Sequence, residues 1–205
     1  MGSIPDAVVA FCLAALLIVG GYQIYFLPQR YPLRASTNLL LSIDSRIPFR
    51  PGWVWIYSFL YYPFIVSTIL TIRDFRQFAY ICINFLILLI IQVTIAFLFP
   101  VRTPPQWRSY DPASSLSTRF LAVVHSVDKG GNCFPSMHIA VATLSALHTA
   151  SNLLPFYGLW SYAVIILPGL IGLSTVFTKQ HYILDIPAGG ILGYAVFSLH
   201  PLIYR

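Results

Sequence analysis

Long apolar segments, separated by loops that carry most of the charge, constrain this chain more than any other feature. Of its 205 residues, 58% are hydrophobic and 9% are charged, and Glu is absent. A soluble domain of this length could not hide so much apolar surface from water. The sequence therefore predicts an all-α integral membrane protein that crosses the bilayer several times.

Six segments are long and apolar enough to cross a hydrocarbon core of about 30 Å. They are Val8–Tyr25, Val54–Thr71, Phe78–Phe99, His138–Leu154, Tyr157–Phe177 and Tyr182–Leu202. The first segment has Asp6 ahead of it and lacks the basic start of a signal peptide, so we expect a true span. We expect one catalytic domain over residues 1–205, folded as a six-transmembrane-helix bundle.

Two polar stretches stand where loops enter apolar segments, namely residues 133–138 and residues 174–185. Each contains a histidine, and ionisable groups at membrane depth are costly and tend to mark function. With six spans, both stretches fall on the same side of the membrane, at the starts of the fourth and sixth spans. His138 and His181 are therefore expected to share one catalytic site, and an odd error in the span count between them would separate them.

The residue types in these stretches suit phosphoryl transfer. His181 and Asp185 are four residues apart at a helix start, so they can meet, and the aspartate would fix the tautomer and raise the basicity of the imidazole. His138 follows Ser136 at another helix entrance, where free backbone N–H groups favour an anion. The candidate phosphate ligands are Ser136, Met137, Ser174, Arg102, Arg108 and Lys179.

These motifs resemble those of the type 2 phosphatidic acid phosphatase superfamily. That pattern runs Lys-x6-Arg-Pro, then Pro-Ser-Gly-His, then Ser-Arg-x5-His-x3-Asp. This chain matches the second motif at residues 135–138 and the third at residues 174–185, with the family's spacing. The resemblance covers about the whole chain and implies a six-helix membrane core with the site at one membrane face.

The chain also departs from that pattern. Met137 replaces the glycine of the second motif, Thr175 replaces the arginine of the third, and the loop from Arg102 to Arg108 stands in place of the first. Phosphate-binding cations of the phosphatases are thus missing or moved. The sequence is nearer in motif to the inositol phosphorylceramide and sphingomyelin synthase branch, which moves phosphate-containing headgroups between lipids.

The resemblance implies a role for each catalytic residue. His181 would attack phosphorus to form a phosphohistidine, Asp185 would orient His181, and His138 would protonate the leaving alcohol. The implied partners are a phospholipid donor, a lipid-alcohol acceptor and membrane lipids. No metal, other cofactor or nucleic acid is expected, and the oligomeric state stays open.

Several alternatives remain at this stage. The chain could be a lipid or polyprenyl phosphate phosphatase, or a non-enzymatic transporter or scaffold that keeps its histidines for packing. The two histidines and Asp185 could instead form a facial metal site. His125, His148 and His200 are expected to be packing residues, and the glycines at 189, 190 and 193 are expected to let the last helix pack closely.

The charges give two answers on orientation. Most basic residues lie on the side of the site, which by the positive-inside rule would be cytoplasmic. Arg73 and Arg76, in one very short loop on the other side, favour the opposite orientation. Because some site-side cations can bind phosphate instead of setting topology, the extracytoplasmic or lumenal face is preferred and the orientation stays open.

Overall fold

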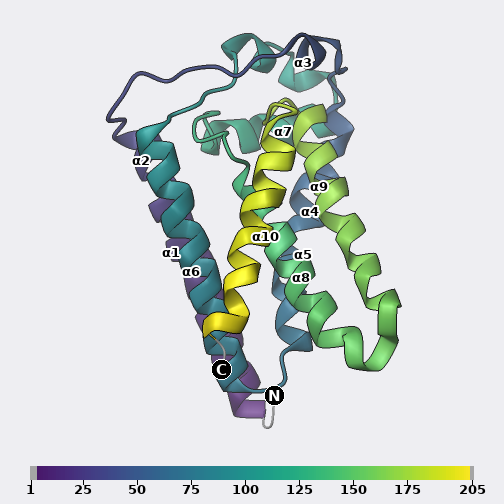
Figure 1. Ribbon diagram of the computed structural model, residues 1–205. Coiled ribbons are helices and arrows are strands. Elements are labelled where there is room, and N and C mark those ends of the chain that lie inside the picture. Colours follow the sequence, from purple (N-terminus) through teal and green to yellow (C-terminus); the bar gives the residue numbers. More distant parts are fainter. Residues whose placement is uncertain (1–3, 204–205) are drawn as a thin grey trace.

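The computed structural model describes residues 4–203, which form a bundle of long helices beneath a cap of loops and short helices (Figure 1). The long helices are α1 (Ile4–Tyr25), α6 (Phe75–Leu98), α8 (Met137–Tyr157), α9 (Ile166–Phe177) and α10 (Asp185–Ile203). The chain starts and finishes at the end of the bundle opposite the cap (Figure 1). Within residues 4–203 the β pairing is limited to one isolated bridge, between Thr37 and Val101. The predicted all-α class is confirmed.

Four helical stretches of the described chain are long and apolar enough to cross a membrane. They are Val8–Arg30, Pro51–Thr71, Phe75–Leu98 and Met137–Phe177. Large apolar side chains on their outer faces are exposed, for example Leu70 at 86% and Ile90 at 65%. Such an apolar exterior is stable against lipid and not against water. The chain is an integral membrane protein, while the count of six spans stays a prediction.

The second expected span is interrupted. It comprises η1 (Pro51–Trp53), α4 (Val54–Phe59), α5 (Tyr61–Ser67) and η2 (Thr68–Thr71). Pro63 has no N–H to bond the carbonyl four residues earlier, and its ring crowds that carbonyl, so α4 ends at Phe59. The interruption lies next to Tyr57 and Tyr61, two buried side chains that face the site.

The fourth and fifth expected spans form one continuous helical stretch that folds back on itself. η5 (Gly158–Ile165) joins α8 to α9 at the end of the bundle away from the cap (Figure 1). Gly158 has φ +54°, in the left-handed region that glycine enters at low cost, and it follows Pro155 in the last turn of α8. The reversal places α9 against α8.

The segment between α6 and α8 was expected to be a long loop, but it contains a helix. α7 (Leu116–Val127) begins with a capping box in which Ser115 accepts from the Thr118 N–H and Thr118 accepts from the Ser115 N–H. The rest of the cap is built from α2 (Leu27–Arg30), α3 (Ser42–Arg46), η3 (Pro105–Arg108) and η4 (Pro112–Ser114). These short elements cover the end of the bundle that carries the motif residues.

Small residues bring α10 against α8. A Cβ added at Gly189 would lie 2.6 Å from the Ser136 carbonyl oxygen, and one at Gly193 would lie 2.5 Å from the Ala140 carbonyl oxygen. The close packing expected of these two glycines is confirmed. Gly190, for which the same role was predicted, has no atom within 4 Å of an added Cβ, so that part of the prediction is wrong.

Candidate active site

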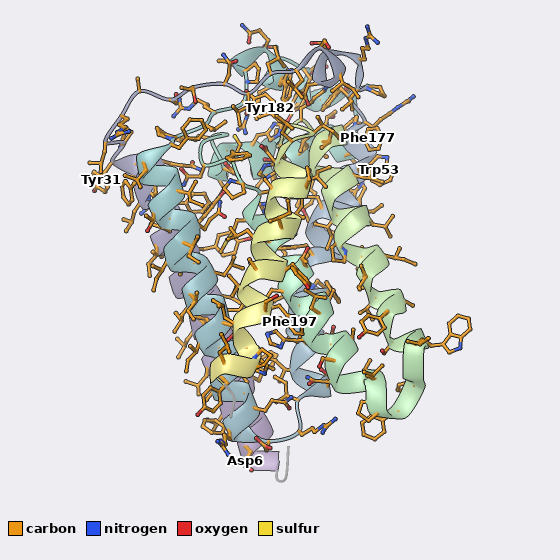
Figure 2. The ribbon with its side chains drawn as sticks, viewed as in Figure 1. Asp6, Tyr31, Trp53, Phe177, Tyr182 and Phe197 are labelled. Atoms are coloured by element: carbon orange, nitrogen blue, oxygen red, sulfur yellow. The ribbon has the colours of Figure 1, made fainter. Side chains whose placement is uncertain are left out.

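Four of the residues singled out in the sequence meet at the cap end of the bundle. Ser136 and His138 lie at the start of α8, His181 lies in the turn between α9 and α10, and Asp185 is the first residue of α10. Figure 2 shows the neighbouring Tyr182 at the top of α10, directly beneath the cap. All four side chains are buried, and His138 is the most exposed of them at 5%.

His181 is held on both sides of its ring. Its Nδ1 lies 2.9 Å from Asp185 Oδ2 and also 2.9 Å from the Cys133 carbonyl oxygen. Both partners are acceptors, so Nδ1 carries the proton and Nε2 keeps its lone pair. Nε2 lies 3.2 Å from Ser136 Oγ. The basic nitrogen of His181 therefore points to the hydroxyl that caps α8.

His138 stands against His181, with 5.7 Å between the ring centroids and the planes at 71°. Its Nε2 lies 2.7 Å from the Tyr57 hydroxyl, and the Tyr61 ring packs at 4.9 Å. Its Nδ1 is buried and has no hydrogen-bond partner within residues 4–203. A buried polar atom without a partner is costly, so Nδ1 is available to bond a further group.

Local hydrogen bonds hold the start of α8 against the start of α10. Ser136 is the N-cap of α8, where its Oγ accepts from the Ile139 N–H, and its own N–H donates to the Asp185 carbonyl oxygen. The carbonyl of Pro135, which follows a cis peptide bond, accepts from the Gln92 side chain of α6. The start of α8 is therefore hydrogen-bonded both to the start of α10 and to α6.

The turn that carries His181 is hydrogen-bonded to α3, in the segment between α2 and η1. The Thr175 carbonyl accepts from the N–H groups of Gln180 and His181, which closes the end of α9. Asp44 of α3 is 1% exposed, and its carboxylate accepts from the Ile183 N–H at 2.8 Å. Asp44 was not singled out in the sequence, because nothing local distinguishes it from a loop aspartate.

The side chains of Ser174, Thr175 and Met137 are directed at other partners than the two histidines. The Ser174 hydroxyl donates to the Ile171 carbonyl at 2.6 Å, and the Thr175 hydroxyl donates to the Gly172 carbonyl at 2.7 Å. Met137 is half-buried and lines an apolar cavity between the helices. The positions that differ from the phosphatase pattern are thus occupied by packed side chains.

The three expected cations lie in different surroundings. Lys179 donates to the carbonyls of Asp44 and Ile47 at 2.9 and 2.7 Å, and its ammonium lies 4.7 Å from the centre of the Trp107 ring. Burial lowers the pKa of Lys179, and the nearby Asp44 carboxylate opposes that shift. Arg102 is exposed. The ammonium of Lys179 is thus directed at the cap and not at the histidines.

Arg108 is placed differently. Its Nη1 donates to the carbonyls of His125 and Asp128, which fixes the guanidinium beneath the cap. Its Nη2 is buried without a hydrogen-bond partner within the described chain. Burial lowers the pKa of Arg108, while the Asp128 carboxylate, the Cys133 thiol and the Tyr57 hydroxyl raise it. Arg108 is therefore close enough to Cys133 and Tyr57 to interact with them electrostatically, and its Nη2 lies beside Gly130.

The structure adds Tyr57 to the site, a residue that the sequence did not indicate. It lies inside an apolar run, where a tyrosine is ordinarily an interfacial side chain. The other histidines lie elsewhere: His125 Nδ1 is 3.1 Å from the Tyr110 hydroxyl, and His148 packs against Phe197, which Figure 2 labels on α10. No group of three or more His, Cys, Asp or Glu side chains within residues 4–203 is arranged to hold a metal ion.

Fold and site together define an all-α integral membrane protein with two buried histidines at one end of its bundle. The chain belongs to the PAP2 superfamily, the type 2 phosphatidic acid phosphatases, whose family model matches residues 33–199. Comparisons with curated proteins and with solved structures gave no significant match. Members of this superfamily are generally phosphatase-type enzymes, so membership suggests phosphatase or phosphotransferase activity on lipid phosphates.

Proposed function

We propose that this chain is a membrane phosphotransferase that moves a phosphate-containing headgroup from a phospholipid to a lipid alcohol. The geometry of His181 carries the proposal. Its Nδ1 is held by Asp185 and the Cys133 carbonyl, and its Nε2 faces the site at 3.2 Å from Ser136 Oγ. An imidazole held in this tautomer is a competent nucleophile.

The reaction has two steps. His181 Nε2 attacks phosphorus and forms the phosphohistidine, while the bond to the leaving oxygen breaks and His138, in its protonated form, gives that oxygen its proton. The neutral His138 then takes the proton of the acceptor hydroxyl as that oxygen attacks phosphorus and frees His181. His138 Nδ1 is the atom assigned to these transfers, because Tyr57 already occupies Nε2.

The phosphoryl oxygens need hydrogen-bond donors, and we assign this role to the start of α8 and to Arg108. The start of α8 offers backbone N–H groups and the Ser136 hydroxyl beside His181. Arg108 supplies the positive charge, since its Nη2 is buried and free of partners in the described chain. Ser174 and Lys179 would have to exchange their present carbonyl contacts to take part, and Arg102 would have to move in from the surface.

Transfer to lipid is preferred over transfer to water for two reasons. The central residues are between 0% and 5% exposed, so bulk water has little access. In addition, Thr175 stands where the phosphatase pattern has arginine, and Met137 stands where it has glycine, and both are neutral, packed side chains. The alternative, a lipid or polyprenyl phosphate phosphatase that releases phosphate to water, is favoured by the family match, since the superfamily is generally of that type.

The proposal includes six spans over a single domain, with the cap and the site on the extracytoplasmic or lumenal face. A phosphohistidine route requires no metal ion, so turnover is expected to persist in EDTA and to be inhibited by vanadate. Complete loss of activity in EDTA would instead favour a metal site built on His138, His181 and Asp185.

One assay separates transfer from hydrolysis. Purified protein in detergent is given a phospholipid labelled in its headgroup phosphate, with and without ceramide or diacylglycerol. Label on the acceptor lipid supports transfer, and label in water supports the phosphatase alternative. If His181→Ala retains wild-type turnover, the catalytic assignment of His181 is wrong. If the wild type itself turns over no lipid substrate, the remaining candidate is a non-enzymatic transporter or scaffold.

A further inference from the structure

An elongated apolar cavity runs from the site into the helix bundle. It lies between α1, α5, η2, α6 and the start of α8, has a volume of about 120 Å³, and is partly open to the surroundings of the bundle. Its walls are apolar side chains such as Leu17, Ile65, Ile69, Ile81, Phe85 and Leu89. A space with this lining suits an apolar ligand.

The length of the cavity matches one lipid chain. Its lining residues extend on α1 from Ala14 to Tyr25 and on α6 from Phe78 to Leu89. At 1.5 Å per residue, each of these stretches is about 16 Å long. The hydrocarbon core of a bilayer is about 30 Å thick, so the cavity spans about one leaflet. One alkyl chain fills one leaflet.

The two ends of the cavity differ chemically. At the end near the cap it is lined by His138, and the hydroxyls of Tyr22 and Tyr62 lie 2.7 Å apart in its wall. At the other end Ile72 and Phe78 line it, and they are 4% and 3% exposed. A lipid would therefore place its polar linkage at the tyrosines and its chain end against a closed apolar floor.

We propose that this cavity binds one alkyl chain of the leaving lipid and selects that chain by its length. The inference rests on the proposed function, in which His138 protonates the leaving oxygen. The lipid attached to that oxygen must lie next to His138, and the cavity begins there. A chain longer than about 16 Å meets Ile72 and Phe78, so it binds less well. The acceptor lipid, whose hydroxyl also gives its proton to His138, takes the place of the leaving lipid after that lipid has departed.

Two adjacent glycines of α1 provide the test and its matched control. Gly21 lines the cavity, and a Cβ added there lies 3.7 Å from Leu89 Cδ2, in ordinary contact. Gly20 is exposed and has no atom within 4 Å of an added Cβ. A leucine side chain at position 21 enters the cavity, whereas one at position 20 enters the surrounding lipid.

The measurement is kcat/KM for a series of donor lipids that differ only in chain length. Gly21→Leu is expected to shift the preference towards shorter chains, lowering the ratio of long-chain to short-chain kcat/KM by at least about tenfold. Gly20→Leu is expected to keep the wild-type profile. An unchanged profile in Gly21→Leu, or the same shift in both variants, overturns the assignment of this cavity.

A binding experiment on the unaltered protein avoids any dependence on how the variants fold. A lipid phosphate with a photoreactive diazirine at its chain end is irradiated with the wild-type protein, and the crosslinked peptides are mapped. Crosslinks near Phe78 or Cys82 support the cavity. Turnover with crosslinks elsewhere overturns the cavity alone, while crosslinks at the floor without turnover of any lipid overturn the proposed function alone.

Discussion

His181 Nδ1 lies between two acceptors, Asp185 Oδ2 and the Cys133 carbonyl oxygen, each at 2.9 Å. The carbonyl alone can hold the proton on Nδ1, so the aspartate is not needed to select the tautomer. What the carboxylate adds is negative charge beside a ring that becomes positive when Nε2 bonds to phosphorus. The Cys133 carbonyl therefore fixes the tautomer of His181, and the Asp185 carboxylate stabilises its positive charge.

Asp185→Asn is expected to lower kcat by about 10²-fold, since the charge is lost while the Cys133 carbonyl still fixes the tautomer. His181→Ala is expected to abolish turnover. Both are measured as initial rates on the labelled phospholipid, with Asp111→Asn, an exposed carboxylate in the cap, as control. A loss in Asp185→Asn as complete as that in His181→Ala would mean that the carbonyl does not hold the ring.

Arg108→Lys is expected to lower kcat/KM by about 10²-fold. A lysine keeps the charge, but it cannot bond two carbonyls on one side and present a free N–H on the other. Arg102→Gln, at an exposed position, serves as the matched control and is expected to stay within about threefold of wild type, since surface substitutions have small effects. Equal losses in the two variants would assign the phosphate contact to Arg102 as well.

Gly193→Ala is expected to destabilise the protein by about 2 kcal/mol, because the added Cβ would lie 2.5 Å from the Ala140 carbonyl oxygen and push α10 off α8. Gly190→Ala, with open space around its Cβ, is expected to be neutral or slightly stabilising. The midpoint of thermal unfolding in detergent measures both changes. A common shift in the two variants would show that helix propensity, and not contact with α8, governs this helix.

The cap is expected to lose stability in acid because of His125. This side chain is 8% exposed, and its burial, aided by the charge of Arg108, lowers the pKa to about 4. The unfolded chain binds the proton at its ordinary pKa of about 6.5, so this contribution is complete above that pH and is lost as the pH falls towards 4. Across that window the loss is at most about 3 kcal/mol.

The test of this pH dependence compares wild type with His125→Gln. Thermal unfolding midpoints at several pH values between 7 and 4 are expected to fall more steeply in the wild type than in the variant. His138 and His181 are present in both proteins, so the difference between the two curves isolates His125. Curves that run parallel would show that another group controls the acid transition.

Much of this molecule followed from its sequence, for physical reasons that are local. The apolar segments predicted an all-α membrane protein, and the family match covers the region that contains both histidine motifs. The spacing of His181 and Asp185 predicted their contact, which is confirmed. The predicted reason, a shared helix face, is wrong, because α10 begins at Asp185 and a turn before the helix brings His181 to it. The placement of His138 beside His181 required only that both stretches lie at one end of the bundle.

The tertiary structure decided what depends on residues far apart in the chain. Three contacts join segments that share no sequence signal. Tyr57 bonds His138, the Asp44 carboxylate accepts from the turn before α10, and Lys179 donates to the Asp44 carbonyl. The apolar cavity is of the same kind, because helices from four parts of the chain form its walls. Spacing along one helix fixes which side chains share its face, whereas the packing of several helices fixes which faces enclose a site.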